Sequence, residues 1–315
     1  MADPGNHPRD NSSPRGRLPT FTTRAVDMTM HCVRQMPWVR KLDHAAEWLR
    51  HGENAERDIL NRVPGWDRRL LPWLEFSPFR AVFLGVIEFR IPGTVQHLLC
   101  RKIWFHEQGV ACLETGEASQ VVILGAGLDP LGLRLCRRFE HASVIEVDRP
   151  APMDIKREAF ADVLNLRFVD VEAESIEAGP VGDLASLGCD PDLPTLVIAE
   201  GLLMYLDPSD VVRTFERFAA SSRAPLRFAF SYLSVARLAD PTSPIARLAT
   251  ALERRRPPEH FAWSTTPEAL PGFLTAKNYT LKETISSSTL ATRILDGRAR
   301  PRDYGEFVAI AATNA

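Results

Sequence analysis

The sequence predicts an α/β fold in which a parallel sheet follows an N-terminal helical lid. Three observations predict it. Short apolar runs without polar alternation recur after residue 115, helical stretches separate these runs, and residues 21–115 carry apolar side chains at helical spacing. Strands buried on both faces of a sheet lack polar alternation, and regular alternation of strands with helices favours right-handed βαβ units.

The chain of 315 residues divides into three parts. Residues 1–20 are rich in Pro, Asn, Arg and Ser and are expected to form a disordered tail. Residues 21–115 form the expected lid, because stretches such as VRKLDHAAEWLRHG and GTVQHLLCRKIWFHEQ place aliphatic and aromatic side chains on one helix face. Residues 116–315 are the expected sheet domain. Its strands are expected at QVVILG (120–125), SVIEVD (143–148), LRFVDV (166–171), PTLVIAEG (194–201), LRFAFSYL (226–233) and, closing the sheet, YGEFVAIAATNA (304–315).

Composition argues against several classes of protein. The formal net charge of -2 provides no overall basic field to attract nucleic acid or an anionic membrane. No run reaches the roughly 18 apolar residues that span a bilayer, and the N-terminus lacks an apolar leader, so we expect a cytoplasmic protein without a membrane partner. The five cysteines form no CxxC pair, which predicts reduced thiols and no metal centre: Cys32, Cys100, Cys112, Cys136 and Cys189.

The first candidate binding feature is the turn Gly125-Ala126-Gly127, which follows the first predicted strand. Ligands of such sheets bind outside the carboxyl ends of the strands. Glycines allow a sharp turn and a close approach to a ligand, while the next helix presents unpaired N–H groups. Asp129 is a candidate cap for that helix, and Pro130 suits its first position. A plain strand-to-helix turn explains the same residues, because a lone GxG is weak evidence.

Carboxylates follow the second predicted strand. Glu146 and Asp148 lie 21 and 23 positions after Gly125, where a carboxylate accepts hydrogen bonds from a ribose diol. This indicates a cofactor that contains a nucleoside, either a dinucleotide or S-adenosylmethionine. Pro130 occupies the position where the dinucleotide fingerprint GxGxxG needs a third glycine, so a nicotinamide dinucleotide is disfavoured.

The third and fourth strands also end in carboxylates. Asp170 is a candidate contact for the adenine edge, and Glu200 is a candidate partner for the positively charged amino group of a methionyl chain. Each carboxylate taken alone fits a solvated strand end equally well. Their succession at the strand ends favours S-adenosylmethionine as the cofactor.

The stretches QVVILGAGLDPLGLRL, VIEVDRPAPMDIKREAF and LPTLVIAEGLLMYLDPSDV resemble the leucine carboxyl methyltransferase family of class I S-adenosylmethionine-dependent methyltransferases. The resemblance covers roughly residues 80 to 220 and rests on the order LGAGxD, ExD and AEGxxxYL. It implies a Rossmann-like class I methyltransferase sheet with added N-terminal helices. It also implies activity on small metabolites such as polyketides, or on a protein C-terminus, as different members of the family act.

The resemblance assigns cofactor contacts residue by residue. It places the glycine turn at Gly125, the ribose at Asp148, adenine at Asp170 and Val171, the amino-acid end at Glu200, and the cofactor carboxylate at Arg90 in EFRIPGT. A guanidinium suits a carboxylate because it binds both oxygens. The first motif departs from the family, which commonly has Asp-Thr or Asp-Ser where this chain has Asp129-Pro130. A further basic contact of the family has three unranked candidates here: Arg68, Arg69 and Arg80.

The methyl acceptor is less well defined by the sequence. A carboxylate acceptor is already a nucleophile, whereas a hydroxyl acceptor needs a base. His260 and Tyr205 are weak candidates for catalysis, while His97 and His106 are expected to be packing or surface residues. The expected mechanism therefore has no obligatory protein base.

The expected function is S-adenosylmethionine-dependent O-methylation of a carboxylate or hydroxyl on a small, polyketide-like metabolite. Two alternatives stay open: carboxyl methylation of a protein C-terminus, and use of the cofactor site for a non-methylating reaction. A dehydrogenase is disfavoured by Pro130, and the basic run 254–256 is expected to be a solvated loop rather than a nucleic-acid site. The oligomeric state is left open.

Overall fold

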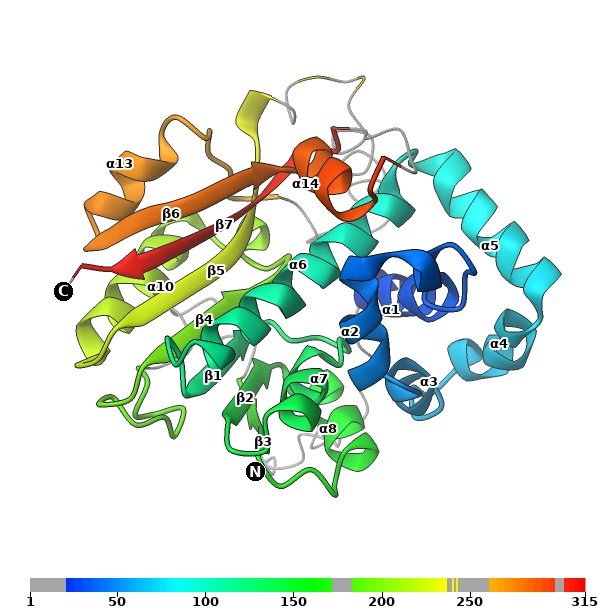
Figure 1. The fold of residues 1–315 in the computed structure, drawn as a ribbon, viewed down its shortest axis with the longest axis horizontal. Helices are drawn as coiled ribbons and strands as arrows, with labels where there is room; N and C mark the ends of the chain where they lie inside the picture. The colour runs from blue at the N-terminus through cyan, green and yellow to red at the C-terminus, as the bar shows by residue number, and fades with distance from the viewer. Residues whose placement is uncertain are drawn as a thin grey trace, which may run out of the picture.

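The computed structural model describes residues 21–171, 183–236, 240, 242, 261–297 and 303–314. The predicted tail (1–20), the basic run 254–256 and the catalytic candidate His260 lie outside these residues. The chain runs from a group of helices into a twisted sheet, as Figure 1 shows by its colour from blue to red.

In the described part of the chain, seven strands form one sheet in the order β3-β2-β1-β4-β5-β7-β6. The strands are β1 (Gln120–Leu124), β2 (Ser143–Asp148), β3 (Leu166–Asp170), β4 (Thr195–Ala199), β5 (Leu226–Leu233), β6 (Tyr279–Ser286) and β7 (Glu306–Thr313). Strands β1 to β5 pair in parallel, and β7 pairs antiparallel with both β5 and β6. The α/β class is confirmed, but the prediction of a parallel sheet is wrong for β7, which runs antiparallel to both of its neighbours.

The central strands are buried on both faces, as their unalternated sequences predict. In β1, Val121 and Ile123 join one apolar cluster, and Val122 and Leu124 join another on the opposite face. Helices α7 (Leu131–Arg138), α8 (Pro150–Ala159) and α14 (Ser287–Ile294) contribute to the first cluster, and α10 (Pro208–Ser221) and α13 (Leu270–Thr275) to the second. The short 3-10 helix η3 (Leu203–Tyr205) follows β4.

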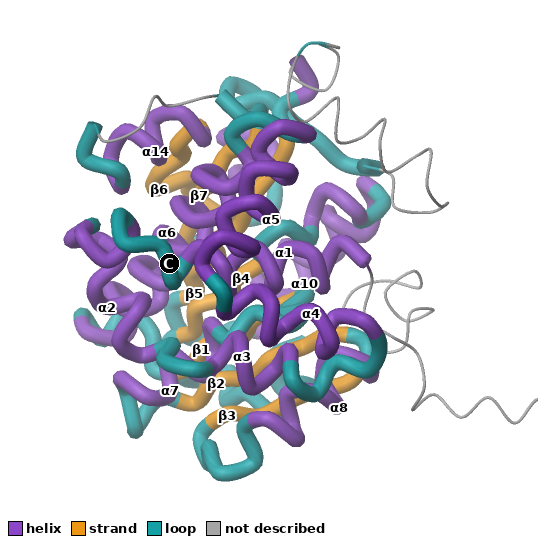
Figure 2. Tube along the Cα trace, turned by 90° about the vertical axis from the view of Figure 1, so that its right-hand side faces the viewer, coloured by secondary structure: helices purple, strands orange, loops and turns teal. Residues whose placement is uncertain are grey.

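Helices occupy the described N-terminal part up to residue 114. They are α1 (Phe21–Val33), η2 (Val39–Lys41), α2 (Asp43–His51), α3 (Ala55–Leu60), α4 (Trp66–Glu75), α5 (Ser77–Arg90) and α6 (Thr94–Glu114). Figures 1 and 2 show α4 and α5 on the outer side of this group, away from the sheet.

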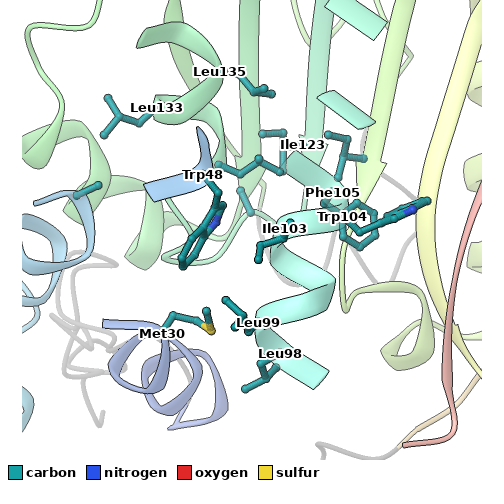
Figure 3. Close-up of a cluster of buried hydrophobic side chains, with 14 of the residues drawn as sticks. Met30, Trp48, Leu98, Leu99, Ile103, Trp104, Phe105, Ile123, Leu133 and Leu135 are labelled. Atoms are coloured by element: carbon teal, nitrogen blue, oxygen red, sulfur yellow. The ribbon is translucent and has the colours of Figure 1, made fainter. Parts of the chain in front are cut away.

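The long helix α6 joins the N-terminal helices to the sheet. It contacts α1, α2 and α5 among the N-terminal helices, and β4, α7 and α14 in the rest of the described chain. Figure 3 shows Trp104 and Phe105 of this helix near Ile123 of β1. Residues from α6 can therefore reach the edge of the sheet where the strands end.

No single helix among the described residues is long and apolar enough to cross a membrane. The helical segments Arg68–Glu75 and Ser77–Arg90 are long and apolar enough only when they are taken together. They are bent by 112° at the break between them. All five cysteines are buried free thiols.

Candidate functional site

The glycine turn is shaped by both conformation and close packing. Gly125 and Gly127 have φ values of 62° and 52°, which L side chains rarely adopt. A Cβ at Gly125 would lie 2.9 Å from the Leu202 side chain, and one at Gly127 would lie 3.2 Å from Thr23 of α1. The turn therefore needs glycine at both positions, and α1 covers it from the N-terminal side.

Asp148 lies beside this turn, as its position at the end of β2 predicts. Its Oδ2 accepts a hydrogen bond from the Gly127 amide at 2.7 Å, and its Oδ1 accepts one from the Arg149 amide at 2.6 Å. The backbone of Gly125 donates to the Val147 carbonyl at 2.8 Å, which fastens the turn to β2. The structure thus brings together the glycine turn and Asp148, the carboxylate that we expect from the sequence to contact a ribose.

Glu146 has a different position from Asp148. It is fully buried, forms an ion pair with Lys156 at 2.5 Å and accepts a hydrogen bond from the Gly132 amide at 3.1 Å. Burial raises the pKa of Glu146, although Lys156 opposes that shift. A Cβ at Gly132 would lie 2.5 Å from Glu146, so this glycine makes room for the carboxylate. Because its side chain is enclosed by α7 and α8, we do not retain Glu146 among the proposed cofactor ligands.

Glu200 follows β4 and meets two cations from α6. Arg101 donates through Nε to Glu200 at 2.9 Å, and Lys102 Nζ lies 3.0 Å from the same oxygen. Arg101 also donates through Nη1 to both oxygens of Glu306 at 2.9 Å. Burial works against the charge of Lys102, but Asp129 and Glu200 outweigh it and raise the pKa of Lys102 to about 12. The site therefore holds buried, charged partners for both a carboxylate and an amine.

Sequence reasoning missed Arg101 and Lys102. The available signal was a pair of basic residues within the apolar helix CRKIWFHE, and both side chains prove to be about nine-tenths buried. By contrast, Arg90 is exposed at the end of α5, and within the described residues it forms no hydrogen bond or ion pair with Glu200 or Asp148.

The other basic candidates have structural or surface positions. Arg80 is buried and donates to the Gln35 side chain and to the backbone carbonyls of Leu74 and Glu75, so it anchors the N-terminal helices. Arg68 and Arg69 are exposed on α4.

Asp129 does not cap α7. The helix begins after Pro130 without a side-chain cap, so the predictions of a cap by Asp129 and of Pro130 as first helical residue are wrong. The Asp129 carboxylate instead pairs with Lys102 and lies 3.4 Å from Arg134. Although burial opposes ionisation, these cations hold the pKa of Asp129 below its usual range.

Asp170 and Val171 lie next to the Asp148 strand end. The Val171 amide donates to the Asp148 carbonyl at 2.9 Å, while the half-exposed Asp170 carboxylate pairs with Arg157 of α8. The predicted adenine and ribose contacts are therefore neighbours, and Asp170 would have to share its charge with Arg157.

His97 and Glu306 form a buried pair that the sequence did not indicate. His97 Nε2 lies 2.5 Å from Glu306 Oε2, and its ring stacks on Tyr304 with centroids 4.2 Å apart. His97 Nδ1 is buried and has no hydrogen-bond partner in the described part of the chain. The expectation that His97 merely packs is incomplete, because this pair contacts Arg101 through Glu306.

The remaining catalytic candidates differ in position. His106 is buried, and burial together with nearby Arg134 lowers its pKa to about 3, so it is a neutral packing residue. Tyr205 is half-buried, with its ring centroid 5.3 Å from that of Phe261.

Asp27 of α1 is a buried acid next to this charged group. Burial, opposed mainly by Lys102 and assisted by Asp129, raises the pKa of Asp27 to about 8. The folded chain therefore holds a proton that the unfolded chain releases near the ordinary value of 3.8. Between these two pH values stability falls as the pH rises, because ionisation favours the unfolded state.

We expect Asp27→Asn to remove this loss of stability. The variant should unfold at a temperature similar to that of the parent near pH 4 and at a higher one near pH 8, with a difference of several degrees, since one pKa unit corresponds to about 1.4 kcal/mol. Thermal unfolding at several pH values measures this. The exposed Asp43→Asn is the matched control, and parallel pH profiles for parent and Asp27→Asn would contradict the assignment.

The strand order, the glycine turn after β1 and the carboxylate after β2 define the class I methyltransferase fold. The structure of an inferred methyltransferase of Thermobifida fusca superposes on this chain with a TM-score of 0.60 and 17% sequence identity. The superposition covers 98% of this chain and 100% of that one. A DUF574 family protein of Streptomyces avermitilis superposes with a TM-score of 0.56 at 14% identity, covering 76% and 92%.

Residues 83–219 match the leucine carboxyl methyltransferase family, which confirms the resemblance predicted from the sequence. A Streptomyces avermitilis protein assigned by inference as an S-adenosyl-L-methionine-dependent methyltransferase is 41% identical over 115 residues, 34% of this chain and 38% of that protein. A Mycolicibacterium vanbaalenii protein with the same assignment is 32% identical over 180 residues, 56% and 57% of the two chains. The match thus spans less than two thirds of these relatives' lengths.

Proposed function

We propose that this protein is an S-adenosylmethionine-dependent methyltransferase. The observation that supports it most strongly is that two different groups of charged residues lie at the same end of the sheet, where the parallel strands end. Asp148 lies against the glycine turn, and Glu200 lies against Arg101 and Lys102. The first arrangement suits a ribose diol, and the second suits an amino acid that carries both a cation and a carboxylate.

The residues fit the proposed cofactor group by group. Asp148 would accept hydrogen bonds from the ribose hydroxyls, and Val171 would border the adenine. Glu200 would pair with the amino group, and Arg101 with Lys102 would hold the carboxylate. When bound, S-adenosylmethionine supplies a methyl group on a positively charged sulfur, which is electrophilic without further activation.

The acceptor we propose is a carboxylate or hydroxyl of a small metabolite. Methyl transfer is an in-line displacement, so the protein's main task is to align the acceptor oxygen and exclude water. A carboxylate needs no base. A hydroxyl needs one, and His97 is the best suited of the described residues, because Glu306 orients its ring while Nδ1 is left without a partner.

Isothermal titration with S-adenosylmethionine, S-adenosylhomocysteine and NAD tests the proposed cofactor. We expect binding of the first two and none of NAD. Binding of NAD alone would overturn the proposal, and binding of none of the three would leave the glycine turn as a structural feature. Formation of S-adenosylhomocysteine with paired acceptors, such as a phenol and the matching benzoate, then distinguishes the two acceptor classes.

We expect Asp148→Asn to weaken the binding of S-adenosylmethionine about 5- to 150-fold, corresponding to the loss of about 1–3 kcal/mol for a charged hydrogen-bond partner. The exposed Asp162→Asn, also in the sheet domain, should bind like the parent. An unchanged affinity in a correctly folded Asp148→Asn protein would remove Asp148 from the site.

A further inference from the structure

The outer face of α5 is apolar and exposed to solvent. The helix itself lies on the outer side of the N-terminal helices (Figures 1 and 2). Its exposed positions between the ends of the helix recur at intervals of one helical turn, and none carries a charge. They are Pro78, Ala81, Val82, Gly85, Val86 and Phe89. Phe89 is 83% exposed and Val82 is 64% exposed, so this stripe lacks a covering element within the described chain. A solvent-facing helix normally presents polar side chains on this face.

Gly85 lies in the middle of this stripe. A Cβ built at Gly85 would meet nothing within 4 Å, so no neighbouring atom of the described structure requires glycine there. Glycine in a helix interior costs about 1 kcal/mol relative to alanine. Together with Ala81 one turn earlier, Gly85 leaves a shallow site where a second helix backbone can approach closely.

Two aromatic side chains that precede α5 in the chain are also exposed. Trp73 of α4 and Phe76 are each 61% exposed. With Phe89 and the two valines they present an apolar surface on the order of 500 Å², taking about 150–250 Å² for a fully exposed aromatic side chain. This is more than half of the roughly 800 Å² per partner that a stable interface buries.

The charges of this surface restrict its partner. A helix that lies on an anionic membrane carries basic residues along its polar edge, whereas α5 exposes only Arg90, at its end, and the exposed Arg68 and Arg69 lie on α4. A strongly charged protein partner would also find no complementary charges within the stripe. An identical apolar stripe on a second copy of the chain would match it in both polarity and length.

We propose that two copies of this protein associate through α5, with the two helices antiparallel and crossing near Gly85. A two-fold axis there makes the surface complementary to itself, because each copy presents the same small centre and the same larger ends. With the crossing at Gly85, the antiparallel arrangement places Phe89 of one copy near Ala81 of the other, because both lie one helical turn from the crossing. The interface lies on the outer side of the N-terminal helices, so it leaves the sheet edge open.

Sedimentation velocity of the full chain tests this proposal over about 1 to 100 µM, a range in which interfaces of this size associate. We expect a concentration-dependent dimer. A chain that stays monomeric over the whole range would overturn the proposal. So would co-sedimentation of a monomeric chain with phosphatidylcholine–phosphatidylserine vesicles, which would assign the surface to a membrane.

Two variants locate the interface. Gly85→Leu fills the close-approach site at a position where a Cβ meets nothing within 4 Å, and Val86→Glu places a charge beside it. We expect each to raise the dissociation constant at least 100-fold with an unchanged circular dichroism spectrum. Leu164→Glu is the control, since Leu164 is 94% exposed outside this surface, and it should dimerise like the parent. A dimer that both α5 variants leave intact would show that another surface is used.

Discussion

Replacing Arg134 with methionine is expected to lower the free energy of unfolding by about 3–5 kcal/mol, because it leaves a buried carboxylate without its main partner. Arg134 is 1% exposed and pairs with Glu56 of α3. It also donates to the Trp48 carbonyl at 3.1 Å, and its guanidinium lies 4.6 Å from the centre of the Trp48 ring. One side chain of α7 therefore holds two N-terminal helices on the sheet domain.

The charge of Glu56 explains the size of this effect. Burial alone would raise the pKa of Glu56, but Arg134 and Arg34 outweigh burial and hold it below the usual range. Without Arg134, the carboxylate must either take up a proton or stay ionised with Arg34 as its remaining partner. Arg34 is itself largely buried, so little water can compensate.

Chemical denaturation near pH 7 measures the effect of Arg134→Met, and a double-mutant cycle assigns it. The double variant Arg134→Met/Glu56→Gln should be more stable than the sum of the two single changes predicts, because no unpaired charge is left. Arg223→Met, which removes an exposed ion pair with Asp192, should leave the denaturation midpoint almost unchanged. A midpoint for Arg134→Met equal to that of Arg223→Met would disprove the anchoring role.

The central part of the fold could be predicted from the sequence because its strands are buried on both faces. Strands β1 and β4 carry continuous apolar runs, and β2 and β5 are mostly apolar, interrupted by Glu146 and by Arg227 and Ser231. Few structures other than a strand buried on both faces accommodate such segments. Strand β6 lies at the edge of the sheet, where one side of the strand stays exposed. Its sequence YTLKETIS includes Lys282 and Glu283 at a register shift, so it lacks the signal of a buried strand. The antiparallel direction of β7 follows from its pairing with β5 and β6, and the residues of β7 do not indicate that direction.

The residues of the candidate site could also be predicted only in part from the sequence. Asp148 and Glu200 could be predicted because strand ends are identifiable and parallel strands bring their carboxyl ends to one edge. Arg101 and Lys102 could not, because a charge within a helix suggests a solvent-facing position until the packing of that helix is known. The position of α6 across β4, α7 and α14 is a tertiary property, and it buries both cations beside Glu200.

A comparison of Arg101 with Arg90 therefore tests the proposed site most directly. Arg101→Lys keeps a cation between Glu200 and Glu306 but cannot donate to both carboxylates and to a bound carboxylate in the fork geometry of a guanidinium. We expect it to weaken the binding of S-adenosylmethionine about 5- to 150-fold, the effect of losing about 1–3 kcal/mol from a charged hydrogen bond.

Arg90→Lys is the matched control, because Arg90 is exposed at the end of α5. It should bind S-adenosylmethionine with the affinity of the parent in the same titration. Thermal unfolding of both variants separates lost binding from lost folding, since a lysine at position 101 still neutralises the two buried carboxylates. If Arg90→Lys weakens binding and Arg101→Lys does not, the cofactor carboxylate lies at the end of α5, and α6 has only a structural role. The opposite result would support the buried cations of α6 as the contact for the amino-acid end of the cofactor, because no change in α5 would then be needed to explain the loss.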